Sequence, residues 1–313
     1  MKGIKIIATG SYLPKDIMSN HDLEKIVDTS DEWIQTRTGI KERRIAKQEE
    51  TTAMLAYNAA KKAIENSNIN KADIDIVIVA TFTSNYLTPS IACLLQEQLG
   101  LKSTILAFDL NAACSGFVYG LMMANSLLSF NNYRYGLVIG AEVISKIIDY
   151  QDRNTCILFG DGAAATIIES QDNSIFQQVH GAIGDDNTLY CKVDNTNKNY
   201  LKMNGKQVFK FAGKVVQASI IKLLTDSNLT IEEIDYIICH QANSRIIDFV
   251  AKGLKADRNK FYMNIDKYGN TSAASIPLVI DEMNQKGLLH QKDKIILVGF
   301  GGGLSYGGIL MEW

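Results

Sequence analysis

The chain has 313 residues, of which 46% are hydrophobic and 21% charged. This is the composition of an ordinary globular protein with a large core, and the length suggests about two domains. The formal net charge is −2 and no basic block stands out, which excludes the concentrated positive face that non-specific nucleic-acid binding needs.

Neither the N-terminal segment nor the cysteines indicate secretion, a membrane span or a metal site. The chain reaches Gly10 and Pro14 before an apolar signal-peptide core is complete, and no run of about 18 apolar residues predicts a membrane span. The five cysteines, at positions 93, 114, 156, 191 and 239, are an odd number without a CxxC pair, which disfavours zinc and disulfide frameworks. A cytoplasmic location with reduced thiols is expected.

The chain repeats itself along its length. Residues 67–80 resemble residues 227–240, which lie 160 positions later. Each stretch follows an apolar-periodic helix, predicted at 51–66 and at 211–226, and each enters a β-branched run that indicates a buried strand. The pair Leu137-Val138 matches 297–298 at the same spacing, and residues 164–169 resemble 307–312. Chance similarity between helix–strand units is the alternative to a true duplication.

A duplicated α/β chain is the fold class that this repeat predicts. Each half is expected to run roughly strand, helix, strand, helix and two strands, and alternating strands and helices favour a sheet covered by helices. The apolar strand runs fit strands buried on both faces. We place the halves at 1–170 and 171–313. No linker rich in Pro, Gly or Ser separates them, so the halves are expected to pack closely.

Cys114 is the candidate nucleophile. A strand predicted at 105–110 leads into a turn of small residues, and an apolar helix is predicted at about 115–128. This places the sulfur at a helix N-terminus, where free N–H groups and the helix dipole favour a thiolate. The alternative is a buried structural cysteine, and we assign that role to the other four.

Two polar residues in the second half are candidate partners. His240 ends a buried strand predicted at 235–239 and begins a loop, the place where parallel-sheet proteins carry their chemistry. Asn270 lies in a turn, with Thr271 or Ser272 as a predicted helix N-cap. This junction occupies the position in the second half that Cys114 occupies in the first. Pseudo-twofold packing would bring the two helix starts together; a core histidine and a capping asparagine are the plainer interpretations.

A glycine-rich segment follows the last predicted core strand, at 295–298. Three successive glycines, 301–303, permit backbone conformations closed to other residues and let a ligand approach main-chain N–H groups, as an oxyanion hole requires. The segment lacks the patterns of phosphate-binding loops. A tight structural turn is the alternative.

These residues together resemble the thiolase superfamily and, most closely within it, the β-ketoacyl-ACP synthase III family. The resemblance covers essentially the whole chain. Its motifs are 10–14 (GSYLP), 28–40 (DTSDEWIQTRTGI), 113–117 (ACSGF), 152–163 (DRNTCILFGDGA), 240–247 (HQANSRII), 269–275 (GNTSAAS) and 300–307 (FGGGLSYG). It implies two pseudo-twofold-related halves in a layered αβαβα fold, a homodimer, and decarboxylative condensation of an acyl-CoA primer with malonyl-acyl carrier protein (ACP). No cofactor is implied, because coenzyme A (CoA) enters as a thioester substrate.

The resemblance also implies roles for individual residues. Cys114 would carry the acyl group with His240 and Asn270 as its partners, and the N–H groups of Cys114 and Gly302 would form the oxyanion hole. The CoA-binding residues would be Trp33, Arg37, Arg153 and Asn243, the last as a pantetheine contact. The carrier-docking residues would be Gln241, Ala242, Asn243, Ser244 and Arg245, with Lys210 and Lys252 as further basic candidates for an acidic carrier.

Three features depart from the family pattern. Thr88 stands where a bulky aromatic residue often reaches the partner subunit's acyl pocket, which leaves room for longer or branched primers. Residues 181–200 differ from the usual pattern, and Ala164 replaces a common glycine. A relative with the same triad in secondary metabolism is therefore one alternative, and an inactive carrier-binding or dimerisation partner is another. A degradative thiolase is disfavoured, because no second cysteine stands in the glycine-rich loop.

Overall fold

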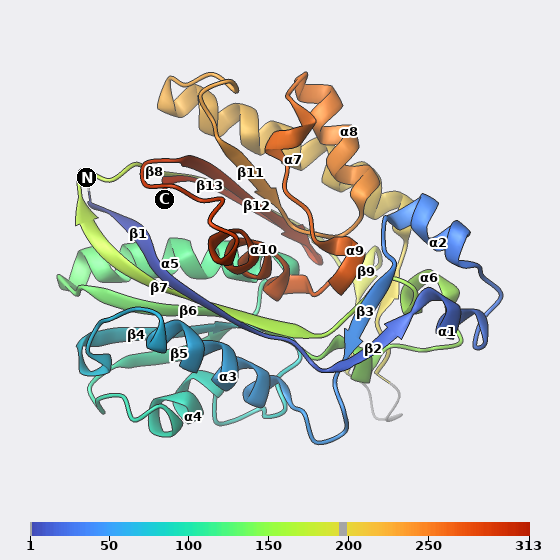
Figure 1. Ribbon diagram of the computed structural model, residues 1–313, viewed down its shortest axis with the longest axis horizontal. Helices are drawn as coiled ribbons and strands as arrows, with labels where there is room; N and C mark the ends of the chain where they lie inside the picture. The colour runs from blue at the N-terminus through green and yellow to red at the C-terminus, as the bar shows by residue number, and fades with distance from the viewer. Residues whose placement is uncertain (1, 194–198) are drawn as a thin grey trace.

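Two β-sheets lie face to face, with helices between them and on both outer faces (Figure 1). The computed structural model describes residues 2–193 and 199–313. The first sheet has the order β1-β7-β6-β4-β5 and the second the order β11-β12-β13-β8. The strands of the first sheet are β1 (Lys2–Tyr12), β4 (Ile74–Ala80), β5 (Leu106–Leu110), β6 (Tyr135–Glu142) and β7 (Gly162–Asp172). Those of the second are β8 (Phe176–Asp185), β11 (Tyr236–Cys239), β12 (Lys294–Gly301) and β13 (Gly303–Glu312).

The helices form three layers around these sheets. Apolar side chains of α3 and α4 cover the outer face of the first sheet, and those of α7 and α8 cover the outer face of the second. Between the sheets, α5 and α10 bury their apolar side chains against both. The helices are α3 (Thr52–Glu65), α4 (Ile91–Gln98), α5 (Gly116–Asn131), α7 (Gly205–Ser227), α8 (Ser244–Leu254) and α10 (Ser275–Gln285). The layered αβαβα arrangement expected from the sequence is confirmed.

Smaller elements gather at one end of the layers, around the loops that follow the strands (Figure 1). They are β2 (Asp16–Ser19), α1 (Asn20–Glu24), α2 (Asp31–Thr38), β3 (Glu42–Ile45), α6 (Arg153–Cys156), β9 (Leu189–Tyr190), β10 (Lys202–Met203) and α9 (Ile265–Tyr268). Short 3₁₀ turns are η1 (Lys71–Asp73), η2 (Ala113–Ser115), η3 (Ile144–Ile147), η4 (Arg258–Lys260) and η5 (Ser272–Ala274).

The repeated segments 67–80 and 227–240 adopt matching structures. Each ends in a parallel core strand, β4 or β11, and Asp75 and Asp235 occupy matching positions at the starts of these strands. The Asp75 carboxylate accepts a hydrogen bond from the backbone N–H of Arg134 at 2.8 Å, and the Asp235 carboxylate accepts one from that of Lys294 at 2.8 Å. In both cases the bond joins the start of one core strand to the start of its neighbour.

Element boundaries differ from the expected ones in two places. The first half runs β1, α3, β4, α4, β5, α5, β6 and β7, which is one strand–helix unit more than the predicted order. Helix α7 begins at Gly205, six residues before the predicted start at 211. Its first turn is polar and exposed, and Asn204 caps it by accepting the Gln207 N–H at 3.2 Å. Apolar periodicity cannot detect such a turn.

One segment corrects the expectation that no membrane-length apolar stretch is present. Among the described residues, Ala113–Asn131 is apolar and long enough to span a membrane by length and composition, with a mean hydropathy of 1.3. Just over half of it, 56%, is buried inside the protein. Helix α5, which forms most of this segment, contacts strands of both sheets. Its apolar side chains therefore pack in the layer between the two sheets.

Candidate active site

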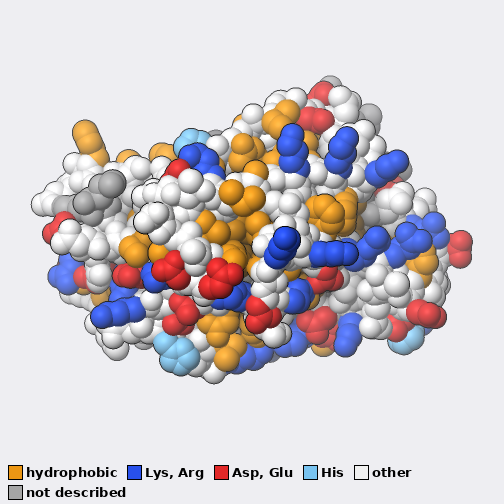
Figure 2. All heavy atoms as spheres, turned by 90° about the horizontal axis from the view of Figure 1, so that it is seen from above, with side chains coloured by type: hydrophobic (Ala, Val, Ile, Leu, Met, Phe, Trp, Pro, Cys, Tyr) orange, Lys and Arg blue, Asp and Glu red, His pale blue; other side chains and the backbone are white. Residues whose placement is uncertain are grey.

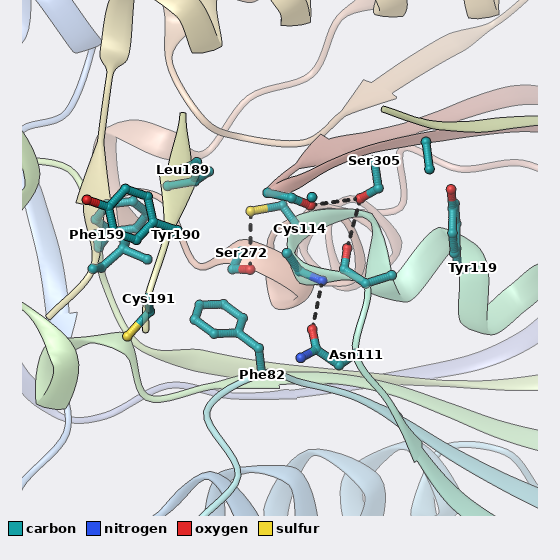
Figure 3. A pocket seen from close by; sticks show the side chains of 16 residues that line it. Phe82, Asn111, Cys114, Tyr119, Phe159, Leu189, Tyr190, Cys191, Ser272 and Ser305 are labelled. Atoms are coloured by element: carbon teal, nitrogen blue, oxygen red, sulfur yellow. Dashed lines mark hydrogen bonds between the residues drawn. The ribbon is translucent and has the colours of Figure 1, made fainter. Parts of the chain in front are cut away.

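The thiol of Cys114 lies in the turn η2, immediately before α5, and is almost fully buried, with 6% exposure. The backbone of Ala113 has a φ of 45°, which turns the chain sharply out of the strand β5. The Ser272 hydroxyl donates a hydrogen bond to Cys114 Sγ at 3.3 Å. Figure 3 shows the two side chains pointing toward one another from different halves of the chain.

The turn that carries Ser272 has the same geometry as the turn that carries Cys114. Ser272 has a φ of 50°, against 45° for Ala113. The Asn111 side-chain oxygen accepts the Ala113 N–H at 3.2 Å, and the Asn270 side-chain oxygen accepts the Ser272 N–H at 2.9 Å. The turns η2 and η5 contact each other, so the two helix starts meet as predicted. Thr271, one of the two predicted N-caps, is the N-cap residue of η5, but its side chain makes no capping hydrogen bond. The Asn270 side chain accepts the Ser272 N–H instead, and the Ser272 hydroxyl donates to Cys114 Sγ.

His240 and Asn270 line one small cavity, of about 80 Å³, together with Cys114 and Asn243. The His240 ring is buried and its Nδ1 lies 2.7 Å from the Ser275 hydroxyl oxygen. Burial lowers the pKa of His240 to about 3, so the imidazole is neutral at physiological pH. Asn270 is held through its backbone, whose N–H donates to the Leu158 carbonyl at 2.8 Å.

A second, larger cavity of about 460 Å³ is also lined by Cys114. Apolar and aromatic side chains form most of its wall, as Figure 3 shows for the labelled residues. The residues that line this cavity with Cys114 include Phe82, Phe159, Leu189, Tyr190, Cys191 and Gly302. The sulfur therefore borders two cavities with largely apolar walls, and the smaller one also carries the polar side chains of His240 and Asn270. This arrangement suits a thiol that receives an acyl chain in one cavity and a second reactant in the other.

The glycine-rich segment packs directly against the nucleophile. A Cβ at Gly301 would lie 2.7 Å from Cys114 Cβ and 3.0 Å from Cys114 Sγ, which is closer than van der Waals contact allows. Gly302 lines the larger cavity together with Cys114. Gly301 is the glycine of this segment under the tightest constraint, because any side chain there would collide with Cys114; the oxyanion hole expected from the sequence stays a prediction.

The substitution Gly301→Ala is expected to slow acylation of Cys114 by at least about 10²-fold, because an attacking atom displaced by roughly 1 Å loses that much rate. The measurement is the rate at which intact protein gains an acyl mass from an acyl-CoA. Gly184→Ala is the matched control, since a Cβ there meets no atom within 4 Å. Unchanged acylation in Gly301→Ala would contradict the close-packing argument.

The three residues predicted to hold the nucleotide of CoA form one cluster at the protein surface. The Arg37 guanidinium lies 4.8 Å from the centre of the Trp33 ring, and the Arg153 guanidinium lies 4.9 Å from it. The Asn243 side-chain amide donates to the Arg37 carbonyl at 3.0 Å, which ties the start of α8 to α2. A continuous path of predicted CoA residues thus runs from the surface to the small cavity that Asn243 lines.

The predicted carrier-docking residues separate into surface and interior groups. Lys210, Arg245 and Lys252 are exposed, and Ala242, Asn243 and Ser244 are partly exposed. Gln241 corrects the prediction: it is 1% exposed, and its amide donates to the Cys239 carbonyl at 2.8 Å. Its side chain supports the loop from inside and is not available to a docked protein.

Two further exposed lysines lie on α7, the helix that carries Lys210, and neither was predicted from the sequence. Lys206 and Lys214 flank Lys210 at intervals of four residues on α7, and all three are exposed. Side chains four residues apart share a helix face, so the spacing of these lysines could have predicted a basic face on α7. Figure 2 shows Lys and Arg side chains in a row across the face seen from above, with apolar side chains beside them.

Thr88 lies outside both cavities of its own chain. It is exposed, as are its neighbours Tyr86 and Leu87, whose exposures are 49% and 107%. The departure at residues 181–200 falls near the site, since Ala182, Leu189, Tyr190 and Cys191 line the larger cavity. Residues 194–198 of that stretch lie outside the described residues.

The protonation of Cys114 differs from the expectation of a thiolate favoured by the helix N-terminus. Burial raises the pKa of Cys114 to about 12, against smaller lowering contributions from the Ser272 hydroxyl and the Cys114 N–H. The nucleophile therefore needs a route by which its proton leaves. Two serine contacts were not predicted from the sequence: the Ser272 hydroxyl donates to Cys114 Sγ, and the Ser275 hydroxyl lies against His240 Nδ1. Glu142, a buried carboxyl at the end of β6, was not predicted either, although an ionisable residue at the end of an apolar strand run is a signal.

Comparisons with known proteins agree with this geometry. Family models for 3-oxoacyl-[acyl-carrier-protein] synthase III match residues 108–186, and for its C-terminal part residues 224–313. The β-ketoacyl-[acyl-carrier-protein] synthase III of Clostridium acetobutylicum is 50% identical over all of this chain and 99% of its own length. The crystal structure of the Aquifex aeolicus enzyme of the same name superposes with a TM-score of 0.94 at 45% identity, covering 99% of this chain and 100% of that one.

A solved structure from another pathway is also similar. The priming β-ketosynthase of the R1128 polyketide biosynthetic pathway has a TM-score of 0.93 at 32% identity, covering 99% of this chain and 96% of that one. It has the same fold, while the identity to the fatty-acid type relatives is higher and extends over the full chain. The chain therefore belongs to the β-ketoacyl-[acyl-carrier-protein] synthase III family.

Proposed function

We propose that the protein joins an acyl group from acyl-CoA to malonyl-ACP, with loss of CO₂, through an acyl-cysteine on Cys114. The observation that carries this proposal is that Cys114, His240 and Asn270 line one cavity although they lie far apart in the chain. A thiol, a neutral imidazole and a carboxamide are the groups that this condensation needs. The reaction uses CoA as a thioester substrate and requires no cofactor.

In the first half-reaction the Cys114 thiolate attacks the acyl-CoA carbonyl and CoA leaves as its thiol. This is covalent catalysis by an activated sulfur. The oxyanion that forms would be stabilised by the backbone N–H groups of Cys114 and Gly302, which both line the larger cavity. The acyl chain would then occupy the apolar space beyond the sulfur.

In the second half-reaction the malonyl thioester loses CO₂ and its enolate carbon attacks the acyl-cysteine. The enolate oxygen needs hydrogen-bond donors. Asn270 qualifies because its side-chain oxygen already accepts the Ser272 N–H, which leaves its NH₂ group for the substrate. His240 qualifies when Nε2 carries the ring proton. The tetrahedral adduct then collapses, the Cys114 thiolate leaves, and β-ketoacyl-ACP is released.

Ser275 determines which ring nitrogen of His240 carries the proton. Its oxygen accepts the Gln241 N–H at 3.4 Å, so its own proton is free to donate to Nδ1, 2.7 Å away. We expect Ser275→Ala to lower the rate of malonyl decarboxylation by roughly 5-fold or more, because one hydrogen bond is worth about 1 kcal/mol or more in a buried site. Self-acylation should be unchanged. Equal loss in both half-reactions would contradict this role.

The surface clusters support proposals for the two substrates. The Trp33 ring between Arg37 and Arg153 offers an aromatic face and two cations for adenine and phosphate. The exposed lysines on α7, with Arg245 and Lys252, form a basic surface near the cavity entrance, which suits an acidic carrier protein. Their loss should raise the KM for the carrier with little change in that for acyl-CoA.

We also propose a cytoplasmic homodimer whose halves divide at 170/171. Strand β7 ends at Asp172 and β8 begins at Phe176, so the crossing between the two sheets follows the proposed division by a few residues. Strand β5 forms an edge of the first sheet, and its Leu106 is 40% exposed. Leu87, in the loop between β4 and α4, is fully exposed. An apolar sheet edge of this kind favours pairing with a second copy, which would bring Thr88 to the partner's larger cavity.

The test of the proposed reaction is product analysis after the protein is mixed with acetyl-CoA and malonyl-ACP. Formation of β-ketoacyl-ACP with one CO₂ per turnover is the expected result. A condensing enzyme of secondary metabolism is the second candidate, favoured by the 32% identical priming ketosynthase and by Thr88. It would use a different acceptor, so a parallel screen of acceptors separates the two functions.

A further inference from the structure

Ser272 places a hydroxyl group against the nucleophile, and the mechanism above does not use it. Its Oγ donates a hydrogen bond to Cys114 Sγ at 3.3 Å, and the two residues come from different halves of the chain (Figure 3). Ser272 is 1% exposed and Cys114 is 6% exposed. Both residues line the larger cavity, so the hydrogen bond lies in the wall of the space proposed for the acyl chain.

The backbone of Ser272 is held in a conformation that aims this hydroxyl at the sulfur. Its φ of 50° lies in the left-handed region, which is unfavourable for a residue with a side chain and persists where the surrounding structure enforces it. The turn is fixed from two sides. The Asn270 side-chain oxygen accepts the Ser272 N–H at 2.9 Å, and a Cβ at Gly140 on β6 would collide with the Ala273 carbonyl oxygen. The hydroxyl is therefore a preorganised donor.

A charged sulfur at this position depends on the hydrogen bonds that it receives. Burial raises the pKa of Cys114 to about 12, and the negative charge of Glu142 adds to this rise, whereas the Ser272 hydroxyl lowers it. Glu142 lies at the end of β6, where it accepts hydrogen bonds from the Thr81 and Thr83 hydroxyls. In the small cavity, burial lowers the pKa of His240 to about 3, so this ring brings no positive charge to the sulfur.

Three other titratable side chains line the larger cavity with Cys114, namely Tyr119, Tyr190 and Cys191. The Tyr119 hydroxyl donates to the carbonyls of Gly181 and Tyr306, and the Cys191 thiol donates to the carbonyl of Asn199. Within the part of the chain that the structure describes, Ser272 is the side chain that is hydrogen-bonded to Cys114 Sγ.

We propose that the Ser272 hydroxyl is a catalytic hydrogen-bond donor that stabilises the Cys114 thiolate when it attacks acyl-CoA and when it leaves the tetrahedral adduct. The hydroxyl keeps its proton and directs it at the sulfur, and the bond strengthens as negative charge develops there. No proton is transferred between the two side chains. This inference rests on the proposed role of Cys114 as the nucleophile.

The main chain and the side chain of Ser272 serve different residues. The N–H holds the Asn270 side-chain oxygen, and the hydroxyl contacts Cys114. A substitution that removes the hydroxyl leaves the N–H in place. We therefore expect such a substitution to slow the steps in which the thiolate takes part and to spare malonyl decarboxylation.

The test is the rate of Cys114 alkylation by iodoacetamide in Ser272→Ala and Ser272→Gly, at a fixed pH of about 8. Mass spectrometry of the Cys114 peptide gives the rate, because Cys93 is an exposed free thiol that also reacts. One hydrogen bond to a charged group is worth about one pKa unit, so its loss lowers the thiolate fraction about tenfold. A more basic thiolate is also more nucleophilic, which leaves alkylation slower by about three- to fourfold.

The sign of the change separates a donor from a steric obstacle. Both variants remove atoms beside the sulfur, so neither hinders the reagent, and unchanged or faster alkylation overturns the proposal. Glycine is the sharper variant, because a φ of 50° suits it and its thermal midpoint should be no lower than the native one. A lower midpoint together with slower alkylation would assign Ser272 a structural role and overturn the proposal. Should Ser272→Ala fail to fold, Ser272→Gly alone decides.

The second readout is CO₂ release from malonyl-ACP by protein that already carries an acyl group. Ser272→Ala should match the native protein in this step, and slowing equal to that of alkylation would overturn the catalytic role of the hydroxyl. Ser219→Ala is the matched control, because Ser219 is also 1% exposed and lines neither cavity. It should alkylate at the native rate, and a slowdown there would overturn the assignment to Ser272.

Failure of the underlying function is recognised separately. If the native protein transfers acyl groups with Cys114 already alkylated, Cys114 is not the nucleophile, whatever the variants show.

Discussion

Replacing Cys114 with alanine is expected to abolish acyl transfer, with a loss of roughly 10⁴- to 10⁶-fold in rate, as when other covalent nucleophiles are removed. No other cysteine lines the small cavity with His240 and Asn270, within the part of the chain that the structure describes. Cys191, in the larger cavity, follows β9 and does not line the small cavity with His240; its sulfur donates to the Asn199 carbonyl at 3.3 Å. It therefore cannot replace Cys114.

The measurement is the mass of the intact protein after incubation with acyl-CoA. The native chain should gain one acyl group and Cys114→Ala should gain none. Cys156→Ala is the control, because Cys156 is a buried free thiol that lines neither cavity. An alanine variant that still acylates at the native rate would remove Cys114 from the mechanism.

Replacing His240 with alanine is expected to leave self-acylation largely intact and to slow malonyl decarboxylation by about 10²- to 10³-fold. This is the usual loss when one preorganised oxyanion donor is deleted. The two half-reactions separate because His240 lines the small cavity, whereas Ser272, whose hydroxyl donates to Cys114 Sγ, lines the larger one. Because the pKa of His240 is lowered to about 3, decarboxylation should not fall as pH drops through about 6.5.

This pH behaviour follows from the direction in which burial moves the pKa of His240. A solvent-exposed imidazole would gain a proton near pH 6.5, whereas the buried ring stays neutral down to much lower pH, so its donor Nε2–H is unchanged. The measurement is CO₂ release from malonyl-ACP by single-turnover kinetics. His290→Ala, at an exposed position, is the control. If His240→Ala loses neither half-reaction, its proposed role is wrong.

The sequence predicted the local structure of the candidate site well where the site residues lie in short motifs. The strand end at His240 and the strand and helix start around Cys114 were predicted within one or two residues, whereas that helix runs to Asn131, three residues beyond its predicted end. The pairing of two helix starts across the repeat was also predicted, because the duplicated segments 67–80 and 227–240 share a pattern of apolar residues that specifies the same local fold.

The supporting residues were not predictable in the same way. Ser272 meets Cys114 across 158 residues of chain. Only the packing of two halves decides that such side chains touch. Gln241 was wrongly predicted to contact the carrier protein. Its amide is buried and donates to the Cys239 carbonyl. A sequence motif does not show whether a loop residue faces the solvent or the interior.

The central claim, that Cys114 carries an acyl group on its way to a malonyl-derived carbon, is tested most directly by intact-protein mass spectrometry. The protein is incubated with acyl-CoAs of different chain lengths and then chased with malonyl-ACP. We expect a single acyl adduct on Cys114 that disappears as β-ketoacyl-ACP forms, and the primer that acylates fastest is the preferred one. An adduct that persists through the chase, or the absence of any adduct, would contradict the proposed reaction.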